Sequence, residues 1–229
     1  LEVQAKTLTI TANSQSVNYL DSYTSSITAT GLATGDLIDT VSYSYTGADN
    51  DGNSYSSTSF PTDAGSYTAT PTAITLSSGS LSNYDINYVG QSLTINKISQ
   101  SSFTLNSSNT TVYYQESATL STSGGNGTGS VSYAINAGAP CSISSSTITT
   151  TGIGSCVVTA TKASSKNYNA TSTNLTITAA AFPISVSAND FTVSYGDSIT
   201  PSISNTNLKN SDQLSSATYT YQGTGSTSY

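Results

Sequence analysis

Apolar and polar residues alternate along most of this chain, and this period of two constrains its fold more than any other feature. Residues 7–11, 41–45, 92–96 and 175–178 each place an apolar side chain at every second position. The pattern predicts β-strands with one buried face and a Ser/Thr-rich face in water. Clusters of Gly, Asn, Asp and Ser return about every ten residues, and no segment has a convincing helical stripe. We therefore expect an all-β fold of sandwich modules.

Part of the sequence occurs twice. The segment 8–47 returns at 184–223 without a gap, shifted by 176 positions. A match of this length, covering apolar, acidic and turn positions alike, is an internal repeat. Tyr229 would align with Asn53, whereas the first copy continues to about residue 96, so we expect the chain to be a piece of a longer repetitive protein. The matching pairs include Asn13 with Asn189, Val17 with Val193, Asp21 with Asp197, Leu32 with Leu208, and Asp36 with Asp212.

Charge and composition disfavour several classes of partner. Charged residues make up 7% of the chain, and the net charge is -7. Histidine and arginine are absent, so the commonest general base and the residue best suited to bidentate phosphate recognition are missing. The negative charge repels nucleic acid and anionic lipid surfaces. We expect no nucleic-acid partner and, because no apolar run approaches the ~20 residues of a span, no membrane insertion in this segment.

No catalytic constellation stands out in the sequence. Catalysis needs an activated nucleophile or a pair of carboxylates. Glu2 and Glu116 are the only glutamates, and neither has an acidic neighbour in sequence. No Gly-x-Ser-x-Gly elbow leads into a helix. We therefore expect no enzyme and no cofactor, with calcium as the one alternative considered below.

The two cysteines, Cys141 and Cys156, lie 15 positions apart. No CxxC motif and no histidine accompanies them, which disfavours a zinc site. Two interpretations remain. One is a disulfide, which would indicate an oxidising compartment; the other is a pair of free buried thiols. We favour the disulfide.

The most site-like segment is the acidic loop 49–53. Asp49, Asp51 and Asn53 offer oxygens at alternate positions, as calcium-binding loops do. The loop lacks the glycine that follows the third ligand position of an EF-hand, and it lacks the bidentate glutamate further on. The corresponding place in the second copy, residues 224–229, has no acid. We favour a plain turn, with calcium bound by these three residues as the alternative. Five other aspartates are expected to cap turns through their own backbone rather than to bind cations: Asp21, Asp36, Asp39, Asp197 and Asp212.

The 16 tyrosines allow two interpretations. Ring faces stack on sugars, so a tyrosine-lined face would be a glycan-binding surface. Most of these residues occupy alternating strand positions, where they are expected to pack in the core or across strands. We favour the core interpretation.

The first unit resembles a known repeat family. The residues that carry the resemblance are Tyr19-Leu20-Asp21, the turn-to-strand segment 61–67, Asn83-Tyr84-Asp85-Ile86, and 90–95. This order is similar to the MBG/YDG-type repeats of large bacterial surface adhesin-like proteins. In such repeats the turn usually reads Tyr-Gly-Asp. The first unit has Leu20 in the glycine place, whereas the second copy keeps Tyr195-Gly196-Asp197.

Residues 98–180 resemble a different module, the bacterial Ig-like repeats that alternate with MBG-type units. The resemblance is carried by 114–120, 123–133 and 154–162, and it implies a β-sandwich in which Cys141 and Cys156 pair. Three segments are thus expected: 1–97 and 181–229 of MBG type, with 98–180 Ig-like. For the MBG-type units an Ig-like sandwich is the first choice. A β-grasp-like sheet with one short helix near residues 32–38 is the alternative.

Both resemblances imply a structural role. Tandem modules of this kind form a stalk or spacer in a secreted or surface-anchored bacterial protein, and copy number sets its length. The implied partners are neighbouring repeats of the same chain. The alternative is an adhesion module that binds glycan or a host surface protein. The implied location is the extracellular side of the bacterial cell surface.

Overall fold

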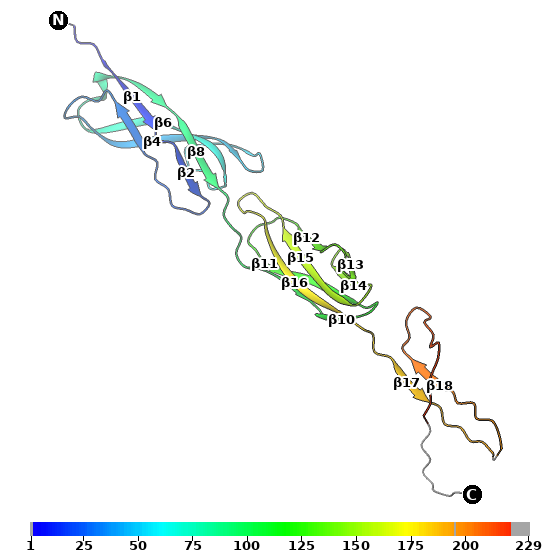
Figure 1. The fold of residues 1–229 in the computed structure, drawn as a ribbon. Coiled ribbons are helices and arrows are strands. Elements are labelled where there is room, and N and C mark those ends of the chain that lie inside the picture. The colour runs from blue at the N-terminus through cyan, green and yellow to red at the C-terminus, as the bar shows by residue number, and fades with distance from the viewer. Residues whose placement is uncertain (1, 195, 221–229) are drawn as a thin grey trace. The chain divides into compact units, whose positions relative to one another are not determined.

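The structure, a computed structural model, describes residues 2–194 and 196–220, and its regular structure is almost wholly β (Figure 1). In that part of the chain, the one helical element is the 3-10 turn η1 (Leu81–Asn83), and no helix has the length and hydropathy that a membrane span needs. The all-β sandwich class expected from the alternation is therefore confirmed. The three-segment division at residues 97 and 180 stays a prediction.

Contacts between Cα atoms divide the chain into two compact units. The first contains Leu1–Asn106, Ser121–Ala134 and Thr159–Leu175. The second contains Ser107–Leu120, Ile135–Val158 and Thr176–Tyr229.

Residues 6–96 form two sheets in which the first and last strands of this segment meet. Strand β1 pairs in parallel with β7, and β2 pairs in parallel with β8. The three-stranded sheet has the order β3-β1-β7, with β1 Lys6–Ala12, β3 Ile27–Thr30 and β7 Tyr84–Val89. The five-stranded sheet has the order β2-β8-β6-β4-β5, with β2 Gln15–Asn18, β4 Leu37–Asp49, β5 Ser54–Ser57, β6 Gly65–Ser78 and β8 Gln91–Asn96.

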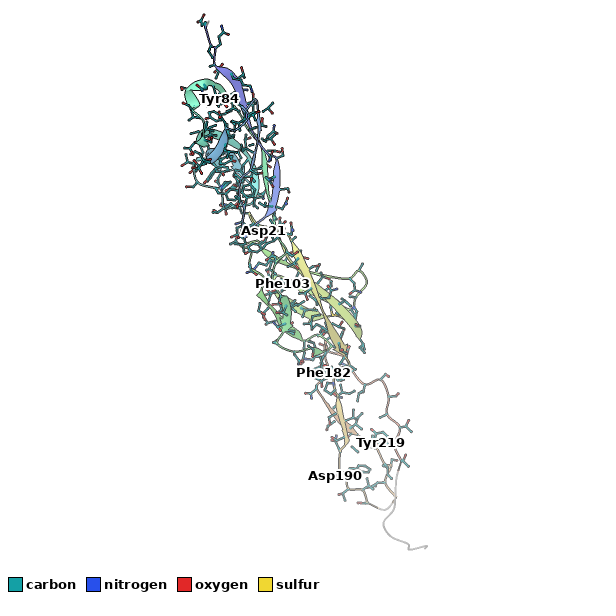
Figure 2. The ribbon with its side chains drawn as sticks, turned by 90° about the vertical axis from the view of Figure 1, so that its left-hand side faces the viewer. Asp21, Tyr84, Phe103, Phe182, Asp190 and Tyr219 are labelled. Carbon is teal, nitrogen blue, oxygen red and sulfur yellow. A yellow bond between two sulfur atoms is a disulfide. The ribbon has the colours of Figure 1, made fainter. Side chains whose placement is uncertain are left out.

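The alternation of β1 points Leu8 and Ile10 into the core, where both are fully buried. They pack in one cluster with Ile74 of β6 and Tyr84 of β7 (Tyr84 is labelled in Figure 2). A second cluster contains Tyr45, Tyr67, Leu93 and Ile95, which lie on neighbouring strands of the five-stranded sheet. Burial of these side chains supplies the main stabilising free energy of residues 6–96.

The short helix of the β-grasp-like alternative does not form near residues 32–38. The backbone N–H of Asp36 donates to the carbonyl of Ala33 across a turn, and β4 begins at Leu37. Tyr84 holds this turn, because its hydroxyl accepts from the Ala33 N–H at 3.0 Å and donates to the Asp36 carboxylate. A tyrosine that comes from a distant strand therefore decides the local conformation.

Two four-stranded sheets are built from residues 103–180. Their orders are β10-β16-β15-β12 and β13-β14-β11-β9. The disulfide between Cys141 and Cys156 joins β13 of one sheet to β15 of the other. The strands are β9 Phe103–Ser107, β10 Thr111–Tyr113, β11 Ser117–Gly124, β12 Val131–Ile135, β13 Cys141–Ser144, β14 Thr147–Thr150, β15 Gly154–Lys162 and β16 Thr171–Ala180.

The second copy of the repeat builds the same strand pair as the first. Strand β17 (Ser185–Ala188) pairs with β18 (Ile203–Thr206) in an antiparallel ladder. Ala188 faces Ile203 there, as Ala12 faces Ile27 in the first copy. Every pair of the β17–β18 ladder has its counterpart in the β1–β3 ladder at the same shift of 176 positions.

Side-chain bonds at the turns repeat with the strands. The amide of Asn13 donates to the Ser26 hydroxyl at 3.0 Å, and the amide of Asn189 donates to the Ser202 hydroxyl at 3.0 Å. The Asp21 carboxylate accepts from the backbone N–H of Asn18.

Other aspartates of the two copies agree with this pattern. The Asp197 carboxylate accepts from the N–H of Ser194, as Asp21 does from Asn18. Asp36 and Asp212 lie in matching turns. The backbone N–H of Asp36 donates to the Ala33 carbonyl, and that of Asp212 donates to the Lys209 carbonyl. Asp39 differs, because its carboxylate accepts a long 3.5 Å bond from the Thr75 hydroxyl across to β6.

Leu20 adopts the conformation of the glycine that it replaces. Its φ is +72°, against +92° for Gly196 in the second copy. A left-handed conformation costs a non-glycine residue about 1–2 kcal/mol, because Cβ crowds the backbone. The Leu20 side chain gains little in return, since it is largely exposed.

Replacing Leu20 with glycine is therefore expected to stabilise the protein by about 0.5–1 kcal/mol, the relief of strain being partly offset by the entropy of the unfolded glycine. Urea unfolding of the 229-residue chain measures the change. Ser22→Gly is the matched control, because Ser22 lies in the same turn region without a positive φ, and it should lose stability. Equal losses for the two variants would contradict the strain argument.

The disulfide generates a second prediction. Replacing Cys141 and Cys156 together with alanine should lower the free energy of unfolding by about 3 kcal/mol, because the closed loop restricts the unfolded chain. Urea unfolding with and without dithiothreitol measures it: the reductant should destabilise the unchanged chain and leave the double variant unaffected. If the reductant leaves the urea midpoint of both proteins unchanged, the disulfide contributes nothing to the free energy of unfolding.

Candidate functional site

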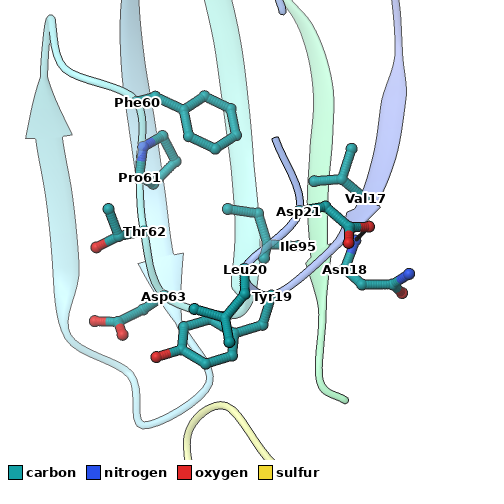
Figure 3. Close-up of a pocket in the computed structure, with 10 residues that line it drawn as sticks. All are labelled: Val17, Asn18, Tyr19, Leu20, Asp21, Phe60, Pro61, Thr62, Asp63 and Ile95. Atoms are coloured by element: carbon teal, nitrogen blue, oxygen red, sulfur yellow. Dashed lines mark hydrogen bonds between the residues drawn. The ribbon is translucent and has the colours of Figure 1, made fainter. Parts of the chain in front are cut away.

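The Leu20 turn lines one wall of a pocket of about 210 Å³ (Figure 3). Tyr19 and Leu20 come from the turn after β2, and Phe60 and Pro61 come from the loop before β6. Ligand sites for small molecules usually enclose about 300–1,000 Å³, so this pocket is below that size. The edge of the Tyr19 ring meets Tyr168, with centroids 5.6 Å apart.

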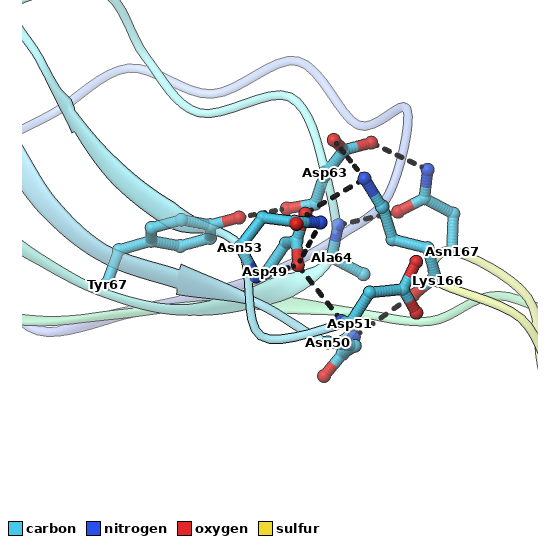
Figure 4. Close-up of polar contacts among 9 residues, drawn as sticks. All are labelled: Asp49, Asn50, Asp51, Asn53, Asp63, Ala64, Tyr67, Lys166 and Asn167. Atoms are coloured by element: carbon cyan, nitrogen blue, oxygen red, sulfur yellow. Dashed lines mark hydrogen bonds and ion pairs between the residues drawn. The ribbon is translucent and has the colours of Figure 1, made fainter.

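The acidic loop 49–53 folds as a tight turn around the Asp49 side chain (Figure 4). The Asp49 carboxylate accepts from the backbone N–H groups of Asp51 at 3.0 Å and Asn53 at 2.9 Å. It also accepts from the side-chain amide of Asn53. These bonds satisfy the backbone where β4 ends and β5 begins, as aspartates at turns commonly do.

Lys166 lies against the same carboxylate, within the first compact unit. Its ammonium is 2.9 Å from the Asp49 carboxylate and 3.3 Å from that of Asp63. Asn167 completes the group, because its amide donates to Asp63 at 2.8 Å and its carbonyl oxygen accepts from the Ala64 N–H at 2.7 Å. Figure 4 shows one lysine between two carboxylates, with the neighbouring asparagine bonded beside it.

Asp49 is the more buried of the two acids that contact Lys166. Its side chain is 8% exposed, compared with 40% for Asp63. Lys166 and Asn53 together hold the pKa of the Asp49 carboxyl well below its ordinary value. The ion pair with Asp49 in turn raises the pKa of Lys166.

The structure brings the three calcium candidates into one turn, but it does not point them at a common centre. Asp49 bonds to Lys166, Asp51 is exposed, and the Asn53 amide nitrogen faces Asp49. Within the described residues, no group of three or more His, Cys, Asp or Glu side chains gathers in a metal-binding arrangement. Calcium binding stays a prediction, which melting in excess calcium against excess chelator would test.

Sequence reasoning missed Lys166, Asp63 and Asn167. Lys166 lies 117 positions from Asp49, and nothing near it in sequence marks it as a partner. The only sequence signal for this contact was the scarcity of cations, because the chain has five basic residues in all. A chain with so few cations has few possible partners for a buried acid.

Many tyrosines of the first unit belong to the core, as the alternation predicted. Tyr45, Tyr67 and Tyr84 are buried, and Tyr43 and Tyr55 pack against the same clusters. Burial raises the pKa of Tyr43 to about 12, with a smaller contribution from neighbouring tyrosines.

No model of a known protein family matches the chain, and no curated protein matches it. Among solved structures, murine CEACAM1b is similar at 10% identity and a TM-score of 0.33, over 76% of this chain and 100% of that one. Drosophila N-cadherin EC1-4 is similar at 11% identity and a TM-score of 0.28, over 77% of this chain and 49% of that one.

A third structure, protocadherin gamma B7 extracellular cadherin domains 1–4, gives 9% identity and a TM-score of 0.21, over 82% of this chain and 55% of that one. This chain thus spans about half the length of each cadherin chain. At TM-scores below 0.5 these likenesses carry no inference about function or family.

The polar group generates a prediction about pH. Because the pKa of Asp49 is lower in the folded chain than its ordinary 3.8, its contribution to stability is complete above that value and is lost as pH falls through the folded pKa. Asp49→Asn should lower the melting temperature at pH 7 and flatten its fall below pH 4. Melting from pH 2 to pH 7 measures both effects.

Asp51→Asn is the matched control, since this exposed acid lies in the same turn and its side chain makes none of the contacts drawn in Figure 4. It should leave the melting curve unchanged. If Asp49→Asn and Asp51→Asn behave alike across the whole range, the ion pair with Lys166 does not stabilise the fold.

Proposed function

We propose that this chain is a structural stalk or spacer segment, without enzymatic activity, of a secreted or surface-anchored bacterial adhesin-like protein. It would be built from MBG/YDG-type units with an Ig-like unit between them. The observation that carries the proposal is the recurrence of one framework, in which the β17–β18 ladder repeats the β1–β3 ladder residue for residue. Repetition of a folded unit serves length and spacing, since each unit adds a fixed increment.

The use of the polar side chains supports a structural role. Asp21, Asp36 and Asp49 each bond to a turn or to a neighbouring side chain. Among the described residues, no buried side-chain nitrogen or oxygen lacks a hydrogen-bond partner. An unpaired buried polar group can mark a catalytic role, whereas here these groups hold the backbone or a neighbouring side chain.

The disulfide supports placement outside the cytosol. Disulfides persist in oxidising compartments such as the extracellular space and the periplasm. The bond between Cys141 and Cys156 fits a protein exposed at the cell surface. An antibody against the chain should therefore label intact cells of the organism that makes it.

Single-molecule stretching tests the spacer proposal. The chain held by its ends should unfold in discrete steps, and reduction of the disulfide should lengthen the extension by about 5 nm, the span of the released loop. The double cysteine variant is the control, since reductant should not change its length. Gradual extension without discrete steps would contradict a stalk of folded units.

The alternative is an adhesion module that binds glycan or a host surface protein. Arrays of glycans and of host matrix proteins, probed with the 229-residue chain, separate the two roles. The spacer proposal expects no saturable signal. Binding that free sugar competes away would replace the spacer role with a recognition role.

A further inference from the structure

Strand β17 carries apolar side chains that its counterpart in the first unit buries. Ile184, just before β17, and Val186 are 51% and 49% exposed, whereas the matching Leu8 and Ile10 are 0% exposed. In the first unit β7 runs parallel to β1, with Ile86 opposite Leu8 and Tyr88 opposite Ile10, and Ile74 of β6 packs in the same cluster. Among the described residues, β17 pairs only with β18.

A pocket of about 520 Å³ lies beside this strand, and one part of its wall corresponds to residues that pack around Tyr84 in the first unit. Leu208, Lys209 and Asp212 in its wall match Leu32, Ala33 and Asp36. In the first unit the Tyr84 ring packs with Leu32, and its hydroxyl bonds to the Ala33 N–H and the Asp36 carboxylate. The residues of the second copy that line the pocket are Ile184, Asn207, Leu208, Lys209 and Asp212, and Phe182 lines it from just before this copy.

Phe182 forms an apolar wall of the pocket, and Tyr113 and Lys209 pack against its ring. Phe182 (labelled in Figure 2) stands where Lys6 stands opposite Tyr84 in the first unit. Its ring packs edge to face against Tyr113, with centroids 6.1 Å apart. The Lys209 ammonium lies 3.9 Å from the centre of the same ring and 3.8 Å from Glu116.

We propose that the edge of β17 and this pocket together form a receptor for one kind of segment, an extended strand with the pattern Tyr-x-Ile-x-Tyr-Val of β7. The strand runs parallel to β17 and extends its sheet, as β7 extends β1. Its first tyrosine enters the pocket, where its hydroxyl accepts from the Lys209 N–H and donates to Asp212. Its isoleucine lies opposite Ile184, and its second tyrosine lies opposite Val186.

The proposal rests on the internal repeat and not on the spacer role. A stalk that never binds this strand and a strand receptor in a protein of another role are both consistent with the repeat. The experiments below therefore leave the proposed function untouched whichever way they come out.

The first test uses the 229-residue chain and a fluorescent ten-residue peptide with the sequence of residues 80–89. Fluorescence anisotropy should show saturable binding. Val186→Asp in the chain should abolish it, and this substitution places a charge at an exposed position without disturbing the fold. Ile199→Asp is the matched control, because Ile199 is 52% exposed and corresponds to Tyr23, which packs in the other cluster.

The peptide itself supplies a second comparison. Changing its first tyrosine to phenylalanine removes two hydrogen bonds and should weaken binding roughly tenfold. Asp212→Asn in the chain should weaken binding of the tyrosine peptide more than that of the phenylalanine peptide. Absence of saturable binding, or binding that Val186→Asp leaves intact, overturns the proposal.

A short peptide can bind too weakly to be measured, so a further test attaches the strand covalently to the chain. A copy of residues 54–97 appended after Tyr229 would supply the strand in the same chain. Hydrogen exchange should then slow at the amides of β17, and changing the appended first tyrosine to alanine should restore fast exchange. Exchange at β17 that is equally fast with and without the appended segment overturns the proposal.

Discussion

The parallel pairing of β7 with the opening strand β1 is the contact on which the first unit depends. Leu8 and Ile10 are fully buried where β7, from more than 70 positions later, lies parallel to β1 and where Ile74 of β6 joins the same cluster. Parallel neighbours cannot be joined by a tight turn, so a long loop must close before this contact forms. In the second copy, where β17 pairs only with β18 among the described residues, the matching residues are about half exposed.

The scarcity of charged residues limits which polar contacts the chain can form. With five lysines and no arginine, the chain has few cations for its acids. Lys166 bonds both Asp49 and Asp63, while four other aspartates accept from backbone N–H groups or neutral side chains, namely Asp21, Asp36, Asp39 and Asp197. A carboxylate that accepts backbone hydrogen bonds stabilises a turn without a counter-charge. The result is a set of turns held by short local bonds and one longer-range cluster of charge.

Several features were predictable from the sequence because they depend on near neighbours. The strand predicted from the alternation at 92–96 forms as β8, Gln91–Asn96, and the loop 49–53 is the expected turn. β5 and β7 were missed, since Ser54–Ser57 holds one apolar residue and Tyr84–Val89 begins within a segment that reads as a loop. The helix weighed for residues 32–38 fails because a distant tyrosine fixes that turn. Lys166 was invisible because no local pattern reports a partner 117 positions away.

The sequence by itself determined the all-β class, the repeat and its shift, and the turn aspartates. These follow from side-chain period, direct comparison of two segments, and bonds that span two to four residues. Only the tertiary structure decided which strand covers which, that Cys141 and Cys156 join two sheets, and that Leu20 holds a glycine conformation. It alone showed the matching register of the two copies and the difference in their burial. Such features depend on segments that meet after folding, and the order of residues along a chain does not record distance in space.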